Sequence, residues 1–145
     1  MIIIERSALV GYSAQRMHAL VDDFESYPAF LPWCSGADVV ERAGERAIAT
    51  IHLNYRGIRE QFTTENNNVP GQSIEIKLVR GPFRTLHGRW RFAALGEGAC
   101  RIELRMEYEI SSRLIERVIG PVFNYIANTL VDAFVRRAEE LYGDE

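Results

Sequence analysis

The chain has 145 residues and a mass of 16.5 kDa, which is the size of one domain. Hydrophobic residues make up 47% of it and charged residues 26%, an ordinary globular composition that excludes a disordered or low-complexity chain. The net charge of −3 argues against broad attraction to nucleic acid, so we expect no DNA partner. We therefore expect one folded domain over residues 1–145 that takes a neutral or apolar ligand.

The N-terminus and the cysteines indicate the compartment. The apolar start at residues 1–4 meets Glu5 and Arg6 at once, far short of a signal sequence or of the roughly 20 apolar residues of a membrane span. Cys34 and Cys100 lie far apart and lack metal-ligand spacing, so neither a disulfide framework nor a metal site is indicated. We expect a reduced, cytoplasmic location.

The first predicted elements are a strand and a short helix. Residues 2–10 are rich in branched side chains and end at Gly11, and Ser13 can act as the N-cap of the helix that follows. The apolar positions of that helix share one face: Met17, Leu20, Val21 and Phe24. Pro28 and Pro32 then prevent a long helix, so the aromatic run between them is predicted to form a compact lid.

Alternating side chains predict six further strands. Turn residues separate them at Gly44, Gly57, the cluster 66–71, Gly81 with Pro82, and Gly96 with Gly98. The strands cover 37–41, 47–55, 58–64, 73–79, 86–94 and 100–110. Together with the first strand they make a seven-stranded antiparallel sheet.

The register of the last two strands can be predicted from the tight turn between them. A turn at residues 96–98 places Trp90 opposite Leu104. The same register gives Arg89 two diagonal carboxylate neighbours, Glu103 and Glu107. We therefore expect the arginines on the outer face of these strands to be largely structural.

The C-terminal segment changes to a helical period. Its apolar positions recur at spacings of one, three and four, and a helix over 121–142 would be about 30 Å long. Gly120 and Pro121 predict a kink or a fresh start after upstream turns at 114–119, and Gly143 predicts the end. Only the apolar face of the sheet is large enough to bury this stripe. The predicted fold class is α+β, a curved antiparallel sheet around a long C-terminal helix, with short helices after the first strand.

A curved sheet that closes on one helix can enclose more volume than its side chains fill, and such pockets bind apolar ligands. Ligand contact and ordinary core packing are both open for each inward residue. Phe30, Leu31 and Trp33 are expected near the mouth of the cavity, and Tyr55 and Ile76 on its wall. The predicted ligand-binding residues are Phe30, Leu31, Trp33, Leu53, Phe62, Trp90, Phe92, Leu104, Met106, Tyr108, Phe123, Ala127 and Leu130.

Candidates for catalysis are few. His18, His52 and His87 have no nucleophile, carboxylate or metal partner by motif, and the two cysteines are expected to be buried, inert thiols. Glu60 shares the inward side of its strand with Phe62, where it could act as a general base or orient a head group. The alternative is a place near the strand end or beside an arginine. We expect no metal, no cofactor and no enzymatic activity.

The arginines allow a different partner. A patch of them could dock on RNA, on a ribosome or on an anionic membrane surface. Pairing with Glu103 and Glu107 is the simpler explanation for part of the set. The residues concerned are Arg56, Arg59, Arg80, Arg84, Arg89 and Arg91.

Four segments in the same order resemble the coenzyme Q-binding protein family of the START-like, helix-grip superfamily, which is also described as polyketide cyclase/dehydrase and lipid transport. They are the aromatic run 27–34, the turn 81–83, the strand 88–92 and the helix segment 131–134. The resemblance covers nearly the whole chain. It implies a START or Bet v 1-like fold that carries ubiquinone or a related lipid in support of respiration. In that family pattern Phe30, Leu31 and Trp33 would form the entrance, while Trp90 and Phe92 would line the interior.

The resemblance also brings two alternatives. Bacterial members are named ribosome-association toxins (RatA-like), the toxin of a toxin–antitoxin pair proposed to bind the large ribosomal subunit and block subunit joining. Members of the wider superfamily are labelled polyketide cyclases, and an enzyme of that kind would depend on Glu60. An isoprenoid ligand would further imply transient contact with a membrane surface, with the protein peripheral to the inner face of the membrane.

Overall fold

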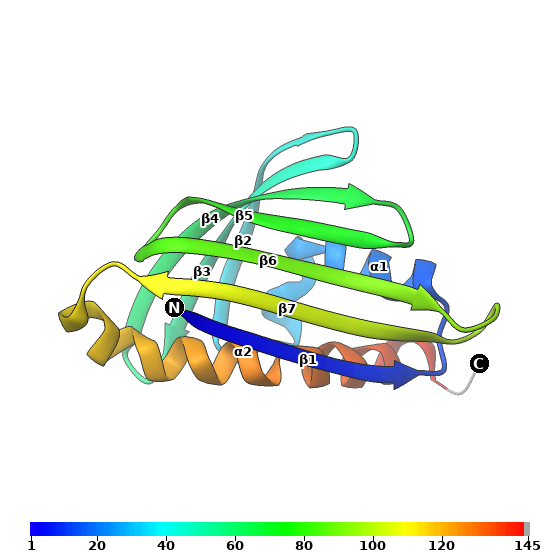
Figure 1. Ribbon diagram of the computed structural model, residues 1–145. Coiled ribbons are helices and arrows are strands. Elements are labelled where there is room, and N and C mark those ends of the chain that lie inside the picture. Colours follow the sequence, from blue (N-terminus) through cyan, green and yellow to red (C-terminus); the bar gives the residue numbers. More distant parts are fainter. Residues whose placement is uncertain (144–145) are drawn as a thin grey trace.

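A single antiparallel sheet curves around one long helix in the computed structural model, which describes residues 1–143 (Figure 1). Its strands follow the order β1-β7-β6-β5-β4-β3-β2, so only β1 pairs out of chain order, with β7. The elements are β1 (Ile2–Val10), α1 (Ala14–Asp22), the 3₁₀ helix η1 (Phe24–Ala29), β2 (Cys34–Ala43), β3 (Arg46–Tyr55), β4 (Ile58–Val69), β5 (Ser73–Arg80), β6 (Phe83–Ala94), β7 (Cys100–Ile110) and α2 (Arg113–Tyr142).

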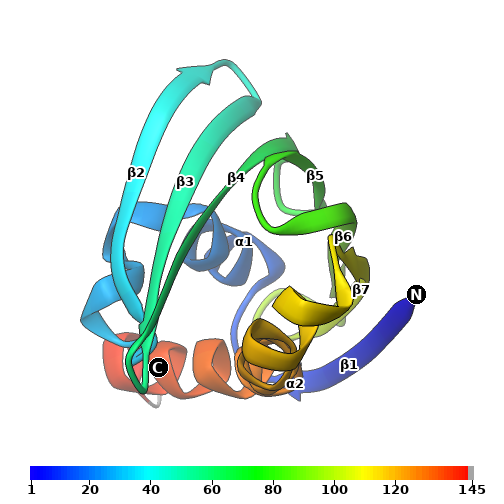
Figure 2. The same ribbon diagram turned by 90° about the vertical axis from the view of Figure 1, so that its left-hand side faces the viewer.

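The layers place the interior between the sheet and α2. Figure 2 shows the sheet arching over α2, which closes the open side, while α1 and η1 lie between the two layers at one end. The inner face of the sheet is apolar along β7, where the buried residues alternate with polar ones from Cys100 to Ile110. This is the α+β helix-grip architecture that the sequence predicts.

The hairpin of β6 and β7 has the predicted register. Trp90 lies opposite Leu104 and Arg89 lies opposite Arg105. The backbone N–H of Leu95 donates to the carbonyl oxygen of Ala99 at 2.9 Å, which closes the hairpin at the predicted turn.

Both helices begin at serine caps. The side-chain oxygen of Ser13 accepts from the backbone N–H of Arg16 at 3.1 Å, as predicted, and Ser112 caps α2 in the same way. Of the two alternatives predicted at Pro121, a kink or a fresh start, the fresh start is wrong, because α2 is one helix through this residue. Apolar residues on both sides of Pro121 are buried in the same core, and its exposed ring replaces an N–H on the solvent side.

Three strand boundaries differ from the prediction by three residues or more. β2 begins at Cys34 and β6 at Phe83, both three residues earlier than expected. The cluster 66–71 is not one turn, because β4 continues to Val69 and only the residues after it turn into β5. The asparagines of this segment pair with β3 and β5, so backbone pairing outweighs their preference for turns.

The helix α2 is long and apolar enough to satisfy the length and composition of a membrane span. It is also the core helix of this fold, since Phe123, Phe134 and Ala138 on its inner side are buried. The apolar composition is therefore accounted for by packing onto the sheet.

Candidate functional site

The predicted ligand-binding residues lie together between the sheet and α2. Most of them are buried, and Phe30, Phe62 and Leu130 are partly exposed. Leu31 and Trp33 are covered in this structure, with 1% and 5% of their surface exposed. Two kinds of side chain fill this interior, and they occupy different ends of it.

One end is built from aromatic rings. We call Phe62, Phe83, Tyr108 and Phe123 the aromatic cluster; the ring of Phe123 lies 4.7 Å from those of Phe83 and Tyr108, and Phe62 lies 5.9 Å from Phe83. The hydroxyl of Tyr108 donates to Oδ1 of Asn124, and burial raises the pKa of Tyr108 to about 12. This end is well packed, and its buried hydroxyl has a partner.

The middle of the interior centres on Phe134 of α2. Its ring contacts Tyr27, Phe30 and Trp90 at centroid distances of 5.3, 5.3 and 5.4 Å. Phe92 stacks on Trp90 at 6.3 Å. The residues expected at the mouth therefore pack onto α2 through Phe30, and Phe134 is a central contact that the predicted site did not include.

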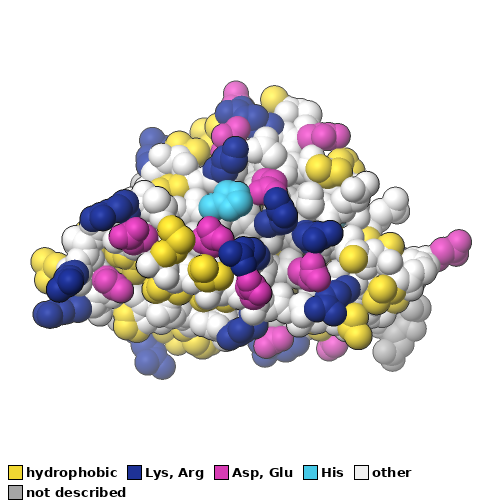
Figure 3. Space-filling view, in the orientation of Figure 1, with side chains coloured by type: hydrophobic (Ala, Val, Ile, Leu, Met, Phe, Trp, Pro, Cys, Tyr) yellow, Lys and Arg dark blue, Asp and Glu magenta, His cyan; other side chains and the backbone are white. Residues whose placement is uncertain are grey.

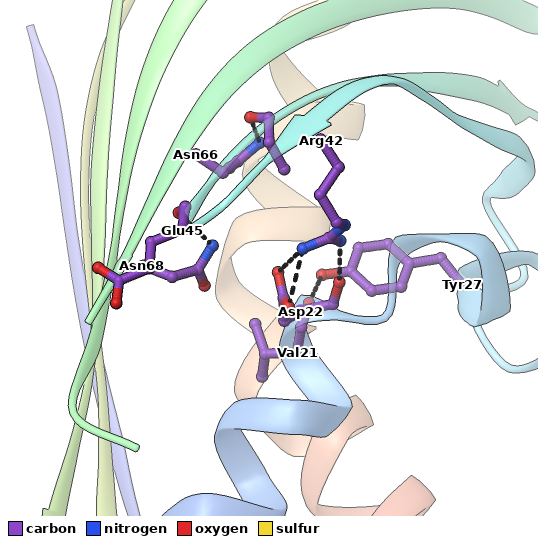
Figure 4. A network of polar contacts seen from close by, with 8 residues as sticks. Val21, Asp22, Tyr27, Arg42, Glu45, Asn66 and Asn68 are labelled. Carbon is purple, nitrogen blue, oxygen red and sulfur yellow. Dashed lines mark hydrogen bonds and ion pairs between the residues drawn. The ribbon is translucent and has the colours of Figure 1, made fainter. Parts of the chain in front are cut away.

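The other end is polar. We call Thr64, Asn66 and Asn68 of β4, together with His18 of α1, the polar cluster; all four side chains are buried. Nδ2 of Asn66 donates to Oγ1 of Thr64 at 3.0 Å, and Nδ2 of Asn68 donates to the carbonyl oxygen of Glu45 at 3.0 Å (Figure 4). Among residues 1–143, neither Oδ1 of Asn68 nor Nε2 of His18 has a hydrogen-bond partner.

The sequence prediction missed this cluster, because residues 66–71 were assigned to a turn. The signal was present in the alternation: Thr64, Asn66 and Asn68 continue the inward positions of Phe62 at a period of two. The prediction expected apolar residues at the inward positions of a strand, and these polar residues are exceptions to that pattern. Such exceptions concentrate at functional sites.

A set of polar contacts holds the end of α1 beside this cluster. Arg42 of β2 donates to both carboxylate oxygens of Asp22 at 3.1 and 3.3 Å (Figure 4). The hydroxyl of Tyr27 donates to the carbonyl oxygen of Val21 at 2.5 Å. Burial, and then the nearby Asp22 carboxylate, raise the pKa of Tyr27 well above its usual value, so the hydroxyl stays protonated and keeps donating.

Of the two settings predicted for Glu60, the structure has the one near a strand end, which is not catalytic. Glu60 lies near the start of β4 opposite Leu53, it is partly exposed, and it accepts from the backbone N–H of Gln61. The two histidines of the outer face do have carboxylate partners that no motif indicated: Nε2 of His52 lies 2.8 Å from Asp38, and Nε2 of His87 lies 3.1 Å from Glu75. These pairs lie on the surface, away from the interior.

Both thiols are free and buried, as the sequence predicts. Burial raises the pKa of Cys34, with a smaller opposing effect from a backbone hydrogen bond with Gly36. Burial also raises the pKa of Cys100. Neither sulfur is a thiolate at neutral pH, and this disfavours a nucleophilic role.

Several arginines of the outer face form ion pairs, but Arg89 pairs with another carboxylate than expected. Nε of Arg89 lies 2.5 Å from Glu75, which is directly opposite it on β5. The predicted pairing of Arg89 with Glu103 or Glu107 is wrong, because each of these carboxylates is taken by an arginine of β7 itself. Figure 3 shows basic and acidic side chains interspersed over this face.

Five concavities on the described part of the surface all open to solvent. One is lined by charged residues of β1, β6 and β7, and another lies beside Glu60. An enclosed cavity between the sheet and α2 is not among these five. The interior that the sequence predicts as a cavity is lined by side chains in mutual contact.

Comparisons with known proteins agree with the fold and assign the class. The Zhui aromatase/cyclase from Streptomyces sp. R1128 superimposes with a TM-score of 0.79 at 16% identity, over 95% of this chain and 93% of that one, so the two share the START-like fold. The family described as "Polyketide cyclase / dehydrase and lipid transport" matches residues 10–135, and the chain belongs to this family.

Two relatives show which members of the family the chain resembles. The ribosome association toxin RatA of Vibrio cholerae serotype O1 is 47% identical over 141 residues, which are 97% of this chain and 98% of that protein. The mitochondrial coenzyme Q-binding protein COQ10 homolog B of Xenopus laevis is 24% identical over 94% of this chain and 58% of that protein. Both names belong to the group that the sequence resemblance indicated.

Proposed function

We propose that the chain binds an apolar molecule with a polar end group, ubiquinone or a related isoprenoid lipid, between the sheet and α2, and that it carries this ligand without transforming it. The observation that supports this most is the polar cluster, in which Asn68 and His18 each keep an unpaired atom inside an otherwise apolar interior. The description of the family as lipid transport and the name of the COQ10 relative point in the same direction.

The packing of the interior sets a condition on binding. Protein interiors are close-packed, so an isoprenoid tail can enter only if aromatic side chains change rotamer or α1 and η1 move away from α2. Tyr27 of η1 and Phe30 at the end of η1 both contact the ring of Phe134 on α2. Their separation would open a path from the solvent to Trp90. The free energy for this comes from burying the apolar surface of the tail, at about 25 cal/mol per Å².

Ligand extraction tests the proposal directly. The purified protein is extracted with organic solvent and the extract is analysed by mass spectrometry, with an isoprenoid quinone or quinone precursor as the expected finding. Binding is then measured with a ubiquinone analogue that has a decyl tail, through quenching of tryptophan fluorescence. In a Trp33→Phe variant only Trp90 reports, and saturable quenching is expected because Trp90 lies inside the site. A protein that yields no lipid and shows no saturable quenching would refute the proposal.

Membrane contact follows from a carrier role. The first turns of α2 expose Leu114 and Val118, at 74% and 52%, and the exposed Arg113 and Arg117 lie beside them. Apolar side chains flanked by basic ones favour a negatively charged bilayer surface. We infer transient docking of this end on the cytoplasmic face of the membrane. Flotation with vesicles containing phosphatidylglycerol should decrease in a Leu114→Glu, Val118→Glu variant and stay unchanged in Val40→Glu, an exposed residue of β2.

A second candidate is association with the ribosome. The observation in its favour is the 47% identity, over nearly the full length of both proteins, to a relative named ribosome association toxin. Arg56, Arg59 and Arg91 are exposed and could contact RNA phosphates. Sucrose-gradient sedimentation after overexpression tests this candidate. Co-sedimentation with the large subunit and fewer assembled ribosomes would support it, and unchanged profiles without co-sedimentation would remove it.

A further inference from the structure

We propose that Asn68 and His18 bind the polar end group of the ligand, and that this site selects an end group with a hydroxyl, such as a hydroquinone or a phenol, over one with carbonyl or ether oxygens alone. The inference rests on the proposed carrier function and adds the chemistry that the interior recognises. It depends on two buried atoms, Oδ1 of Asn68 and Nε2 of His18.

The orientation of the Asn68 amide is determined by its neighbour. Its nitrogen donates to the backbone carbonyl of Glu45 at 3.0 Å, and a carbonyl oxygen can only accept, so the amide cannot be flipped. The oxygen of the amide therefore points away from Glu45 and lies on the side of α1 (Figure 4). The side chain of Asn68 is 7% exposed. An amide oxygen accepts only, so the group that pairs with it must carry a donor.

His18 supplies a second polar atom in the same part of the interior. The residue is 8% exposed, and its ring meets the ring of Phe92 edge-on at 5.5 Å. An imidazole nitrogen can donate or accept according to its tautomer. Nε2 of His18 can therefore pair with either a hydroxyl or an ether oxygen of the end group. His18 therefore contributes affinity for both kinds of end group, and Asn68 contributes the preference for an end group with a hydroxyl.

The sheet brings the two residues to one end of the interior. Asn68 pairs with Ile74, and Ile74 pairs with Trp90, whose ring stacks on Phe92 beneath His18. Adjacent strands lie about 4.8 Å apart, so two strand spacings separate the backbone of Asn68 from that of Trp90. The start of α1 also packs against the turn that follows β4, where Gln15 contacts Gly71.

Unpaired buried polar atoms are uncommon, because more than about 90% of buried polar groups in native proteins have a hydrogen-bond partner. The neighbouring Asn66 follows this rule, since its amide donates to Thr64. The described residues hold three exceptions: Oδ1 of Asn68, Nε2 of His18 and Nε of Arg137, whose guanidinium lies over the ring of Phe30. The first two come from separate elements that line one interior, so they mark a site where a ligand supplies the partners. Restoring one such bond is worth about a tenfold gain in affinity.

The test compares two redox forms of one probe. The decyl-tailed ubiquinone analogue and its quinol have the same skeleton, but only the quinol carries hydroxyls. Calorimetric titration under anaerobic conditions should give about tenfold tighter binding of the quinol by the wild-type protein. Asn68→Leu should abolish this preference, and His18→Phe should weaken the binding of both forms.

The chain offers a matched control. Asn67 lies next to Asn68 on the opposite face of β4, opposite Arg46 and Glu75, so Asn67→Leu should keep the preference for the quinol. Asn68→Leu should fold, because the carbonyl of Glu45 still accepts from the backbone N–H of residue 68 at 2.8 Å. Thermal unfolding checks this.

The possible outcomes separate the two proposals. Equal binding of both forms by the wild type, or a preference that survives in Asn68→Leu, would overturn the hydroxyl site and leave the carrier function intact. Failure of the folded wild type to bind either form would overturn both. A preference for the quinol that is lost only in Asn68→Leu would support the site.

Discussion

The aromatic cluster and the polar cluster lie in the same interior, yet they satisfy opposite requirements. In the aromatic cluster the rings of Phe83, Tyr108 and Phe123 lie as close as 4.7 Å, and the buried hydroxyl of Tyr108 has its partner. In the polar cluster Asn68 and His18 keep unpaired atoms at similar burial. The first arrangement stabilises the fold, whereas the second leaves buried polar atoms unpaired, which costs stability and is common at binding sites.

The largest effect on stability is expected from a substitution in the aromatic cluster. Phe123→Ala should lower the free energy of unfolding by about 3–5 kcal/mol, because a ring with 3% exposure is removed from contact with three others. Urea denaturation followed by circular dichroism measures it. Tyr125→Ala, at a half-exposed position of the same helix, is the control and should cost about 1 kcal/mol. Equal losses would show that the ring contacts do not stabilise this end.

A smaller effect is expected from the satisfied part of the polar end. Asn66→Ala should cost about 1–3 kcal/mol, because the variant leaves the hydroxyl of Thr64 without its donor in a buried place. Asn67→Ala on the outer face should stay within about 0.5 kcal/mol of the wild type. Denaturant unfolding of both variants gives the comparison. If Asn66→Ala is as stable as the control, the polar cluster is not an ordered network.

The pH dependence of stability tests the burial of Tyr108 in the aromatic cluster. The folded pKa of Tyr108 is about 12 against an ordinary value of 10, so the folded chain holds a proton that the unfolded chain loses between pH 10 and 12. Stability should therefore fall as pH rises through that window, by about 1.4 kcal/mol for each unit of pKa difference. Burial raises the pKa of Tyr27 in the same direction. Tyr108→Phe should reduce the fall of the urea midpoint between pH 10 and 12, and an unchanged slope would contradict the assignment to Tyr108.

The smallest effect is expected from an ion pair that lies beside the polar cluster. Arg42 and Asp22 form a partly exposed ion pair between β2 and the end of α1. A double-mutant cycle with Arg42→Gln and Asp22→Asn should give a coupling of about 0.2–1 kcal/mol, and less at high salt. A coupling that does not respond to salt would show that the pair acts through packing rather than charge.

Much of the fold could be predicted because its pattern is local. The alternation from Cys100 to Ile110 predicts β7 with its observed ends, and the short turn after β6 places Trp90 opposite Leu104. The partner of Arg89 was not predictable in this way. The partner of Arg89 depends on β5, which pairs with the edge of β6 that faces away from β7 and places Glu75 opposite Arg89.

The candidate site was predicted in part. Inward apolar residues such as Phe92 and Phe123 do lie between the sheet and α2, because one face of each element must be buried. Asn66 and Asn68 were missed because asparagine favours turns in isolation. In the sheet Asn66 pairs with β3 and β5, and Asn68 pairs with β5 while its N–H donates to the carbonyl of Glu45. Their burial is a property of the whole sheet.

The amino-acid sequence by itself determined the seven strands, the long C-terminal helix and the apolar lining between them, since periods of two and 3.6 residues need only neighbours along the chain. The tertiary structure alone decided which polar atoms of that lining have partners. Whether Asn68 or His18 finds a hydrogen bond depends on the elements that the curvature of the sheet brings opposite each of them. No local pattern contains that information, because the partners come from distant parts of the chain.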